Sequence, residues 1–149
     1  MAANAWAFYD EFREFLGDGT IDLDGDSFRA ALYLSTSNAA TTSTSGKAAL
    51  TNEHANANGY TTNGVALTSV TWVRSTVTLT FDSADAVWNA SGGSIIARFS
   101  VIYDDTVTTP VADPLVCFSL LDNAPADVTA TDGNSLTVQM NASGIFTLT

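Results

Sequence analysis

The chain has 149 residues, of which 16 are acidic and 5 are Lys or Arg, so its formal net charge at pH 7 is −11. That length suits one domain and buries about 70% of the unfolded surface, enough for a hydrophobic core without disulfides or metals. The negative charge repels phosphate backbones and argues against nucleic-acid binding, while no segment reaches the roughly 18–20 apolar residues of a membrane helix.

The first predicted element is a helix from about residue 5 to residue 16, capped by Asn4 and ended by Gly17. The segment also lacks the basic start and long apolar core of a secretion signal. Its large apolar residues form one face. They are Trp6, Phe8, Tyr9, Phe12, Phe15 and Leu16. Three turns with so much aromatic surface are marginal alone, so this face is expected to pack on the chain's own sheet or on a neighbouring subunit.

The next segment, residues 18–26, reads DGTIDLDGD and has aspartates at alternate positions. A helix-loop-helix calcium site is disfavoured, because aligning Gly25 with the glycine of that motif puts Ala31 at its bidentate acidic position. A hairpin turning at Asp24-Gly25 is favoured, with a cation site as the weaker alternative. The alternating apolar residues that follow predict a strand from Phe28 to Leu34.

Residues 35–49 are small and polar, which predicts a loop or an exposed segment at a tip. The only histidine, His54, cannot build a usual zinc site alone and is expected at the surface. Two turn dipeptides, Asn58-Gly59 and Asn63-Gly64, flank Tyr60 and predict that the chain doubles back there.

The stretch from Thr68 to Phe81 alternates apolar and polar residues and predicts one long strand with a buried and a wet side. The stretch from Ser94 to Asp104 is apolar on both sides and predicts a central strand. Between them, Trp88 is expected to cover the end of the core. Asp104 and Asp105 end the central strand, and since adjacent strand residues face opposite ways they are not expected to share one site.

Further strands are predicted at residues 115–121, 128–130, 136–140 and 145–148, with a hairpin signal at Asp132-Gly133. The single cysteine, Cys117, lies in the apolar run PLVCFSLL and is expected to be a buried thiol. The whole pattern predicts a mainly β protein: an antiparallel β-sandwich, jelly-roll or immunoglobulin-like, with one N-terminal α-helix, in a single domain spanning residues 1–149.

Catalytic motifs do not emerge from the sequence. The nearest approach to a nucleophile elbow, Ala90 to Ser94, does not match that motif, and there is no glycine-rich phosphate loop. Carboxylate pairs occur, but the sequence gives them no geometry. We therefore expect a protein that is not an enzyme and that has no cofactor and no metal.

Several short motifs follow one another along the chain. They are Asn-Glu, Gly-Tyr-Thr, Gly-x-x-Leu and Val-Thr-Trp within residues 51–72, Phe-Asp-x-x-Asp-Ala-Val-Trp at 81–88, Ala-Arg-Phe-x-Val-Ile-Tyr-Asp-Asp at 97–105, Pro-Leu-Val at 114–116 and the block at 127–134. Their order resembles that in small virion proteins of tailed bacteriophages. The resemblance covers most of the chain after Ala31. His54 departs from it, because the family pattern has a small or uncharged residue there.

The resemblance implies a structural part of the virion, made in the cytoplasm of a bacterial host and carrying no catalytic residues. A strongly negative protein suits the outer surface of the head rather than its DNA-filled interior. The leading expectation is therefore a capsid decoration or cement protein that binds the major capsid protein and itself as a symmetric oligomer, such as a trimer. Its expected interface is the aromatic helix face together with Tyr60. The alternative is a tail or fibre-associated module that binds a host receptor or glycan through Tyr60 and the tryptophans.

Overall fold

The computed structural model describes residues 4–122 and 126–149. Its helices are α1 (Asp10–Gly17) and the short 3-10 helix η1 (Lys47–Ala49). The strands are β1 (Ala7–Phe8), β2 (Phe28–Tyr33), β3 (Val65–Ala66), β4 (Thr71–Ser75), β5 (Thr78–Asp82), β6 (Ala86–Asn89), β7 (Ile95–Ala97), β8 (Phe99–Asp104), β9 (Leu115–Leu120), β10 (Val128–Ala130), β11 (Ser135–Val138) and β12 (Phe146–Leu148). The protein is mainly β with antiparallel sheets and a helix near the N-terminus, which confirms the predicted fold class.

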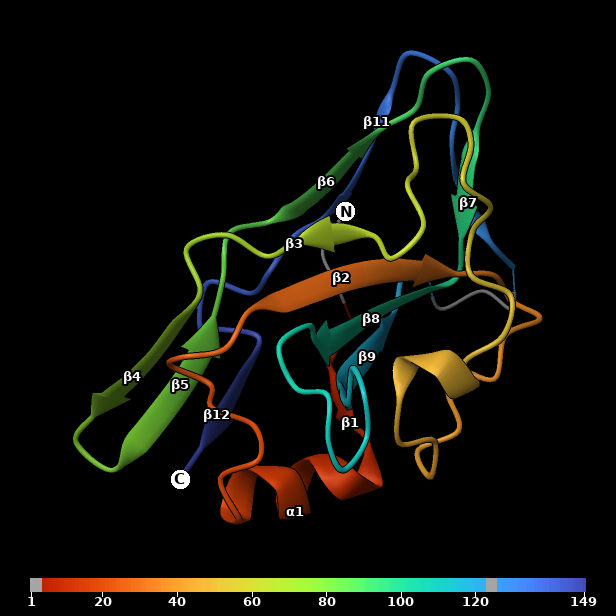
Figure 1. Ribbon diagram of the computed structural model, residues 1–149. Helices are drawn as coiled ribbons and strands as arrows, with labels where there is room; N and C mark the ends of the chain where they lie inside the picture. Colours follow the sequence, from red (N-terminus) through yellow and green to blue (C-terminus); the bar gives the residue numbers. More distant parts are fainter. Residues whose placement is uncertain (1–3, 123–125) are drawn as a thin grey trace.

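A five-stranded sheet in the order β1-β9-β8-β2-β3 forms the centre of the molecule (Figure 1). The middle strand, β8, is buried along its whole length, so the prediction of a central strand is confirmed for Phe99–Asp104. The segment before it behaves differently, because β7 leaves this sheet at Arg98 and pairs with β10. The apolar residues on the two faces of β8 pack into two different hydrophobic clusters.

The central sheet separates two hydrophobic clusters because its side chains alternate between its faces. On β2, Phe28, Ala30 and Leu32 join the larger cluster, while Ala31 and Tyr33 join the smaller one. The smaller cluster includes Ala39, from the small polar loop of residues 35–49, with Leu50 packed against it. This loop therefore lies over one face of the sheet and is not only a protruding tip.

The predicted long strand from Thr68 to Phe81 is wrong, because the chain reverses in its middle. β4 and β5 form a hairpin in which Ser75 pairs with Thr78 and Trp72 pairs with Phe81. Thr76 turns the chain with a φ of 56°, and β12 pairs with β5 on the other side. One continuous strand would put Val73 and Phe81 on the same face, because they are eight residues apart, but in the hairpin Val73 lies on the opposite face from Phe81.

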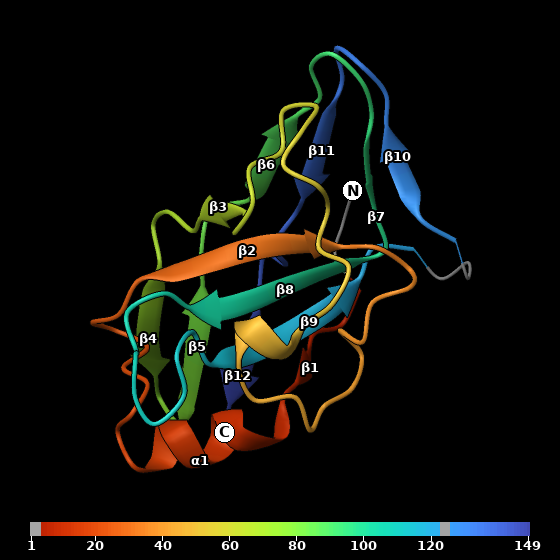
Figure 2. The same ribbon diagram turned by 45° about the vertical axis from the view of Figure 1, so that its right-hand side comes forward.

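Two separate two-stranded ladders lie on the opposite side of the central sheet from α1 (Figure 2). β6 pairs with β11, and β7 pairs with β10. Asp132-Gly133 turns the chain between β10 and β11 with Gly133 at a φ of 80°, but these strands pair with different partners and not as a hairpin. Trp88, on β6, is buried in the core, as expected.

The N-terminal helix begins five residues later than predicted. Ala7 and Phe8 pair with Phe118 and Cys117 of β9, and the Asn4 side chain donates to the carbonyl of Leu120 instead of capping a helix. Tyr9 precedes α1 in an extended conformation without a side-chain cap. Sheet pairing has replaced the first turns of the helix.

The expected hairpin at Asp24-Gly25 is also absent, because residues 18–26 form consecutive turns and not strands. The Asp22 carboxylate accepts the N–H of Asp24, and the Asp26 carboxylate accepts the N–H of Asp22. Ile21 and Leu23 are buried between these turns and anchor the loop in the core. The aspartates thus stabilise a compact loop through their own backbone.

Candidate interaction surface

The structure places most of the predicted interface residues inside the chain's own core. Tyr9, Phe12, Phe15 and Tyr60 are each at most 6% exposed, so as they stand they cannot contact another subunit. Their assignment to an interface is corrected. Trp6, Phe8 and Leu16 are half-buried against the larger cluster, and a role for them between subunits stays a prediction.

An aromatic cluster explains why the helix face is buried. Phe146 of β12 lies 4.9 Å from Phe8, 5.6 Å from Phe12 and 5.1 Å from Phe81, measured between ring centroids. Two of these contacts are edge-on, the geometry that the charge distribution of aromatic rings favours. The helix is therefore docked on the strands of its own chain.

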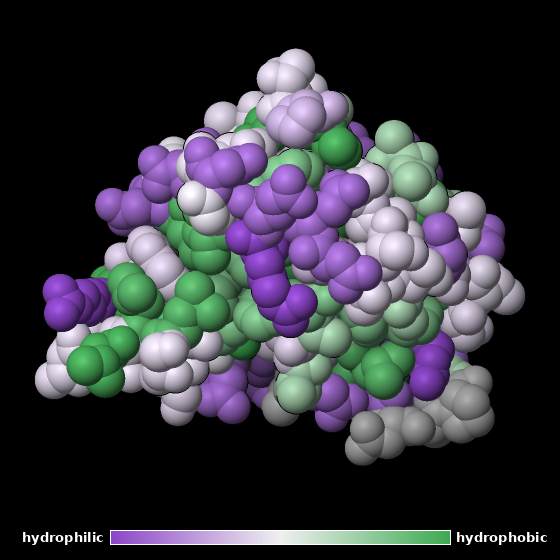
Figure 3. Space-filling view, turned by 90° about the horizontal axis from the view of Figure 1, so that it is seen from below, coloured by the Kyte–Doolittle hydropathy of each residue, from purple (hydrophilic) through white to green (hydrophobic). Residues whose placement is uncertain are grey.

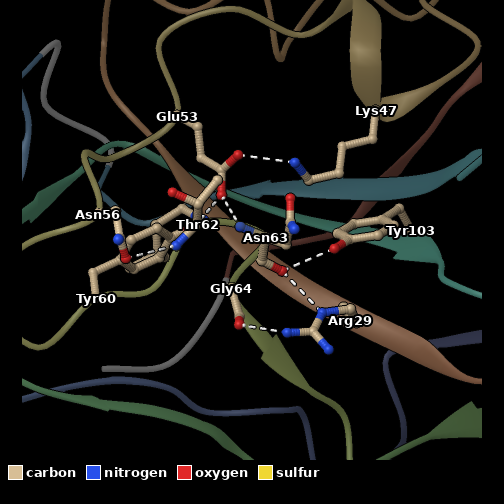
Figure 4. A network of polar contacts seen from close by, with 10 residues as sticks. Arg29, Lys47, Glu53, Asn56, Tyr60, Thr62, Asn63, Gly64 and Tyr103 are labelled. Carbon is tan, nitrogen blue, oxygen red and sulfur yellow. Dashed lines mark hydrogen bonds and ion pairs between the residues drawn. The ribbon is translucent and has the colours of Figure 1, made fainter.

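Tyr60 is held in a polar network beneath the loop that carries it (Figure 4). Its hydroxyl donates to Oε1 of Glu53 at 2.7 Å and accepts the N–H of Leu32 at 3.1 Å. Glu53 also accepts the N–H of Asn63 at 2.6 Å and binds Lys47 at 2.9 Å. Burial raises the pKa of the Tyr60 phenol far above its usual range. The network joins residues 47–64 to the central sheet.

A second set of contacts in Figure 4 holds the turn at residues 63–64. The carbonyl of Asn63 accepts hydrogen bonds from the Tyr103 hydroxyl and from Nε of Arg29, and the carbonyl of Gly64 accepts from the same guanidinium. Arg29 also lies 3.7 Å from the carboxylate of Asp105. The Arg29 and Lys47 side chains here act within the fold.

His54, expected at the surface, is only 7% exposed. Its Nδ1 lies 2.7 Å from the carbonyl oxygen of Ala55, and its ring packs 5.0 Å from that of Tyr60. Among the residues that the structure describes, no three His, Cys, Asp or Glu side chains are placed to hold a metal ion. The imidazole therefore belongs to the packing around Tyr60.

Asp104 and Asp105 lie at the end of β8 and point in different directions, as expected. Asp104 is fully buried and its Oδ1 accepts the N–H groups of Thr106 and Val107, whereas Asp105 is exposed and faces Arg29. Burial, together with the nearby Asp26 carboxylate, raises the pKa of Asp104 to about 6. The two adjacent aspartates do not form a shared site.

The two most exposed large apolar residues mark a different surface from the predicted one, while Val87 on β6 and Ile96 on β7 are less exposed. Val73 is 56% exposed on β4 and Val77 is 77% exposed in the loop of the β4–β5 hairpin. The hairpin extends away from the body of the molecule (Figure 1), and hydrophobic residues show at its end on the left of Figure 3. We call β4, β5 and their loop the exposed hairpin. The sequence places only Arg74 and Asp82 as charges within it.

Negative charge is concentrated on the neighbouring end of the molecule. Residues 10–26 contain seven acidic residues and one cation, Arg13. The acids are Asp10, Glu11, Glu14, Asp18, Asp22, Asp24 and Asp26. They lie on α1 and on the loop that follows it, in red and orange at the bottom of Figure 1. The protein thus combines an acidic end with a hairpin of low net charge.

An open groove of about 480 Å³ separates the N-terminal segment from the end of the chain. Trp6, Asn4, Asn141 and Ser143 are among its lining residues. The indole nitrogen of Trp6 is buried and has no hydrogen-bond acceptor among the residues described. An aromatic ring beside amide and hydroxyl groups suits a small polar ligand.

None of the helices within residues 4–122 and 126–149 has the length and apolar character needed to cross a membrane. Comparisons with protein-family models, with curated proteins and with solved structures found no match.

Proposed function

We propose that this chain is a non-enzymatic structural protein of a tailed-bacteriophage virion, most specifically a decoration or cement protein on the outer head. The observation that carries the proposal is the exposed hairpin. Its Val73 and Val77 side chains are in contact with solvent and do not pack into the hydrophobic core. Apolar side chains that are exposed together on one projecting element suit contact with a partner, whereas single exposed apolar residues are ordinary. The order of motifs that resembles small virion proteins supports the same assignment.

In this proposal the major capsid protein receives the loop of the exposed hairpin. Val77 is the most exposed large apolar residue at that loop. The charge on residues 10–26 keeps free copies soluble until they find the lattice. Binding energy then comes from apolar surface buried between the hairpin and the capsomer.

The first test locates the protein in purified virus particles by immunogold labelling and mass spectrometry. The proposal expects many copies on the head surface. Finding the protein only on tails, or missing from particles, would overturn it. Deleting the N-terminal helix is a poor test, because Phe12 and Phe15 belong to the core and their loss would unfold the chain.

A surface substitution gives a sharper test. Val77→Asp should reduce binding to heads that lack the protein, because it puts a charge into the apolar contact. Val87→Asp is the matched control, since Val87 is 44% exposed on β6, outside the hairpin. Equal binding of both variants and the natural protein would reject the role of the hairpin.

A second candidate function is a tail or fibre-associated module that binds a host glycan. The groove beside Trp6 favours it, whereas Tyr60 and Trp88 are buried and cannot stack on a sugar. A glycan array distinguishes the two functions. Specific binding that is lost in Trp6→Ala, with the fold retained, would support the glycan module over the decoration protein.

A further inference from the structure

β4 is an open edge of the sheet β12-β5-β4. Its burial pattern leaves four of its five residues exposed, with Trp72 half-buried. Natural edge strands are protected by charged side chains, especially lysines, and by prolines, bulges or a covering segment. The sequence TWVRS has no Lys or Pro, and its one charged residue, Arg74, donates a hydrogen bond to the carbonyl of Thr76 in its own hairpin. The pairing of β4 with β5 has no register shift, and no described strand pairs with its outer edge. An edge of this kind accepts another strand.

The hairpin geometry determines which backbone groups point outward. The two-residue loop of Thr76 and Val77 is closed by Ser75 and Thr78, and such a closing pair is hydrogen-bonded in both directions. Because the pattern alternates, Val73 also bonds to β5, whereas the N–H and C=O groups of Trp72 and Arg74 point to the open edge.

The strand is complementary to itself. When a second copy of β4 lies antiparallel across a two-fold axis at Val73, Trp72 of each copy pairs with Arg74 of the other, and the two Val73 side chains meet. This register forms four backbone hydrogen bonds and places each guanidinium beside an indole ring. The neighbouring registers that keep the hydrogen bonds put two Arg74 or two Trp72 residues opposite each other, and like charges opposite each other are unfavourable.

We propose that the partner of β4 is β4 of a second copy of this chain, joined in a two-fold, antiparallel strand pair centred on Val73. The inference rests on the proposed function in one respect, because a decoration protein is expected to associate with itself. The β4–β4 strand pair makes this association two-fold, whereas the sequence suggested a trimer. Because the two strands run antiparallel, the two loops with Val77 lie at opposite ends of the pair and take no part in the strand contact.

Cysteine crosslinking of the purified full-length protein tests this register. The two Val73 residues form a non-hydrogen-bonded pair, whose Cα separation of about 4.5 Å lies within the range of a disulfide. Val73→Cys should therefore give a covalent dimer rapidly under mild oxidation. Val77→Cys is the matched control, because its side chain is more exposed but lies away from the axis. The natural Cys117 is buried and should not compete.

Sedimentation over a concentration series tests the unmodified edge. The natural protein should form dimers, and Val73→Lys should weaken them about tenfold or more by placing two ammonium groups opposite each other. Val87→Lys should leave the dimer unchanged. The inference is overturned if the natural protein stays monomeric, if both lysine variants weaken the dimer equally, or if Val73→Cys crosslinks no faster than Val77→Cys. Because these assays use no virus particles, their failure would leave head binding to be judged separately.

Discussion

The carboxyl group of Asp104 interacts with that of Asp26 where the Asp-rich loop meets the end of β8. Oδ2 of Asp104 is buried and has no N–H or hydroxyl donor among the residues described, while Oδ2 of Asp26 accepts the N–H of Asp22. Two neighbouring carboxylates repel each other unless one proton lies between them. The junction is therefore most stable when Asp104 is protonated.

This pair makes folding stability depend on pH. The pKa of Asp104 is about 6 in the folded protein, above its usual value of 3.8, so protonation of Asp104 favours the folded state. The contribution is fully present below about pH 4 and is lost as the pH rises through 6. After allowance for solvent screening, the loss should be about 1 to 2 kcal/mol.

Asp104→Asn tests this prediction, because an amide imitates the protonated acid. It can still accept the N–H groups of Thr106 and Val107 while donating to Asp26. Thermal unfolding should show the variant more stable than the natural protein at pH 7.5 and no more stable at pH 4. Asp105→Asn, at the exposed neighbour, is the control and should show no such dependence. A constant difference between Asp104→Asn and the natural protein at all pH values would refute the proton-sharing pair.

The central strand could be predicted from the sequence because its signal is local. Phe99 to Asp104 carry apolar residues on both sides, and that pattern is typical of a strand in the middle of a sheet. The β4–β5 turn had no such signal, because Thr76 adopts a positive φ that is rare for a β-branched residue and replaces the usual Asn or Gly. A continuous Thr/Val pattern therefore concealed a reversal.

The candidate surface was harder to predict, since burial depends on contacts between distant residues. Phe12 looks like an interface residue on an isolated helix, but Phe146, near the other end of the chain, covers it. Tyr60 sits between two turn dipeptides that suggest exposure, yet Glu53 and Leu32 hold its hydroxyl inside. The local pattern showed which residues are apolar, and only the topology showed which of them remain open.

Neutralising Glu53, in the network beneath Tyr60, is predicted to lower folding stability more than neutralising an exposed carboxylate. In Glu53→Gln the carbonyl oxygen can still accept from Tyr60 and Asn63, but the amide then faces the ammonium group of Lys47. Breaking a largely buried ion pair in this way should cost about 2 to 4 kcal/mol. Urea unfolding measures the loss. Glu14→Gln, on the exposed side of α1, should change stability by less than about 0.5 kcal/mol, and similar losses in both variants would contradict a special role for Glu53.

Gly64 is predicted to tolerate no side chain. It has a φ of 69°, and a Cβ atom there would lie 1.9 Å from the carbonyl oxygen of Ala30 in β2. Gly64→Ala should therefore displace the backbone of the central sheet and lower stability by about 3 kcal/mol or more. Gly133→Ala isolates the steric part, because Gly133 has a similar φ of 80° with nothing within 4 Å of the added atom. In the same urea titration the Gly133→Ala control should lose only about 1 kcal/mol of folding stability. Equal losses in the two variants would show that the positive φ, and not the contact with Ala30, causes the destabilisation.

The thiol of Cys117 is predicted to be unreactive toward thiol reagents in the folded protein. It lies on β9 with no exposed surface, and burial raises the pKa of its thiol well above the usual value. Since the thiolate is the reactive form, a disulfide reagent such as Ellman's should label the native chain only as fast as the chain unfolds. In guanidinium chloride one thiol per chain should react at once. Rapid labelling of the native protein at pH 8 would show that β9 opens, and with it the pairing between β1 and β9 that replaces the first turns of the helix.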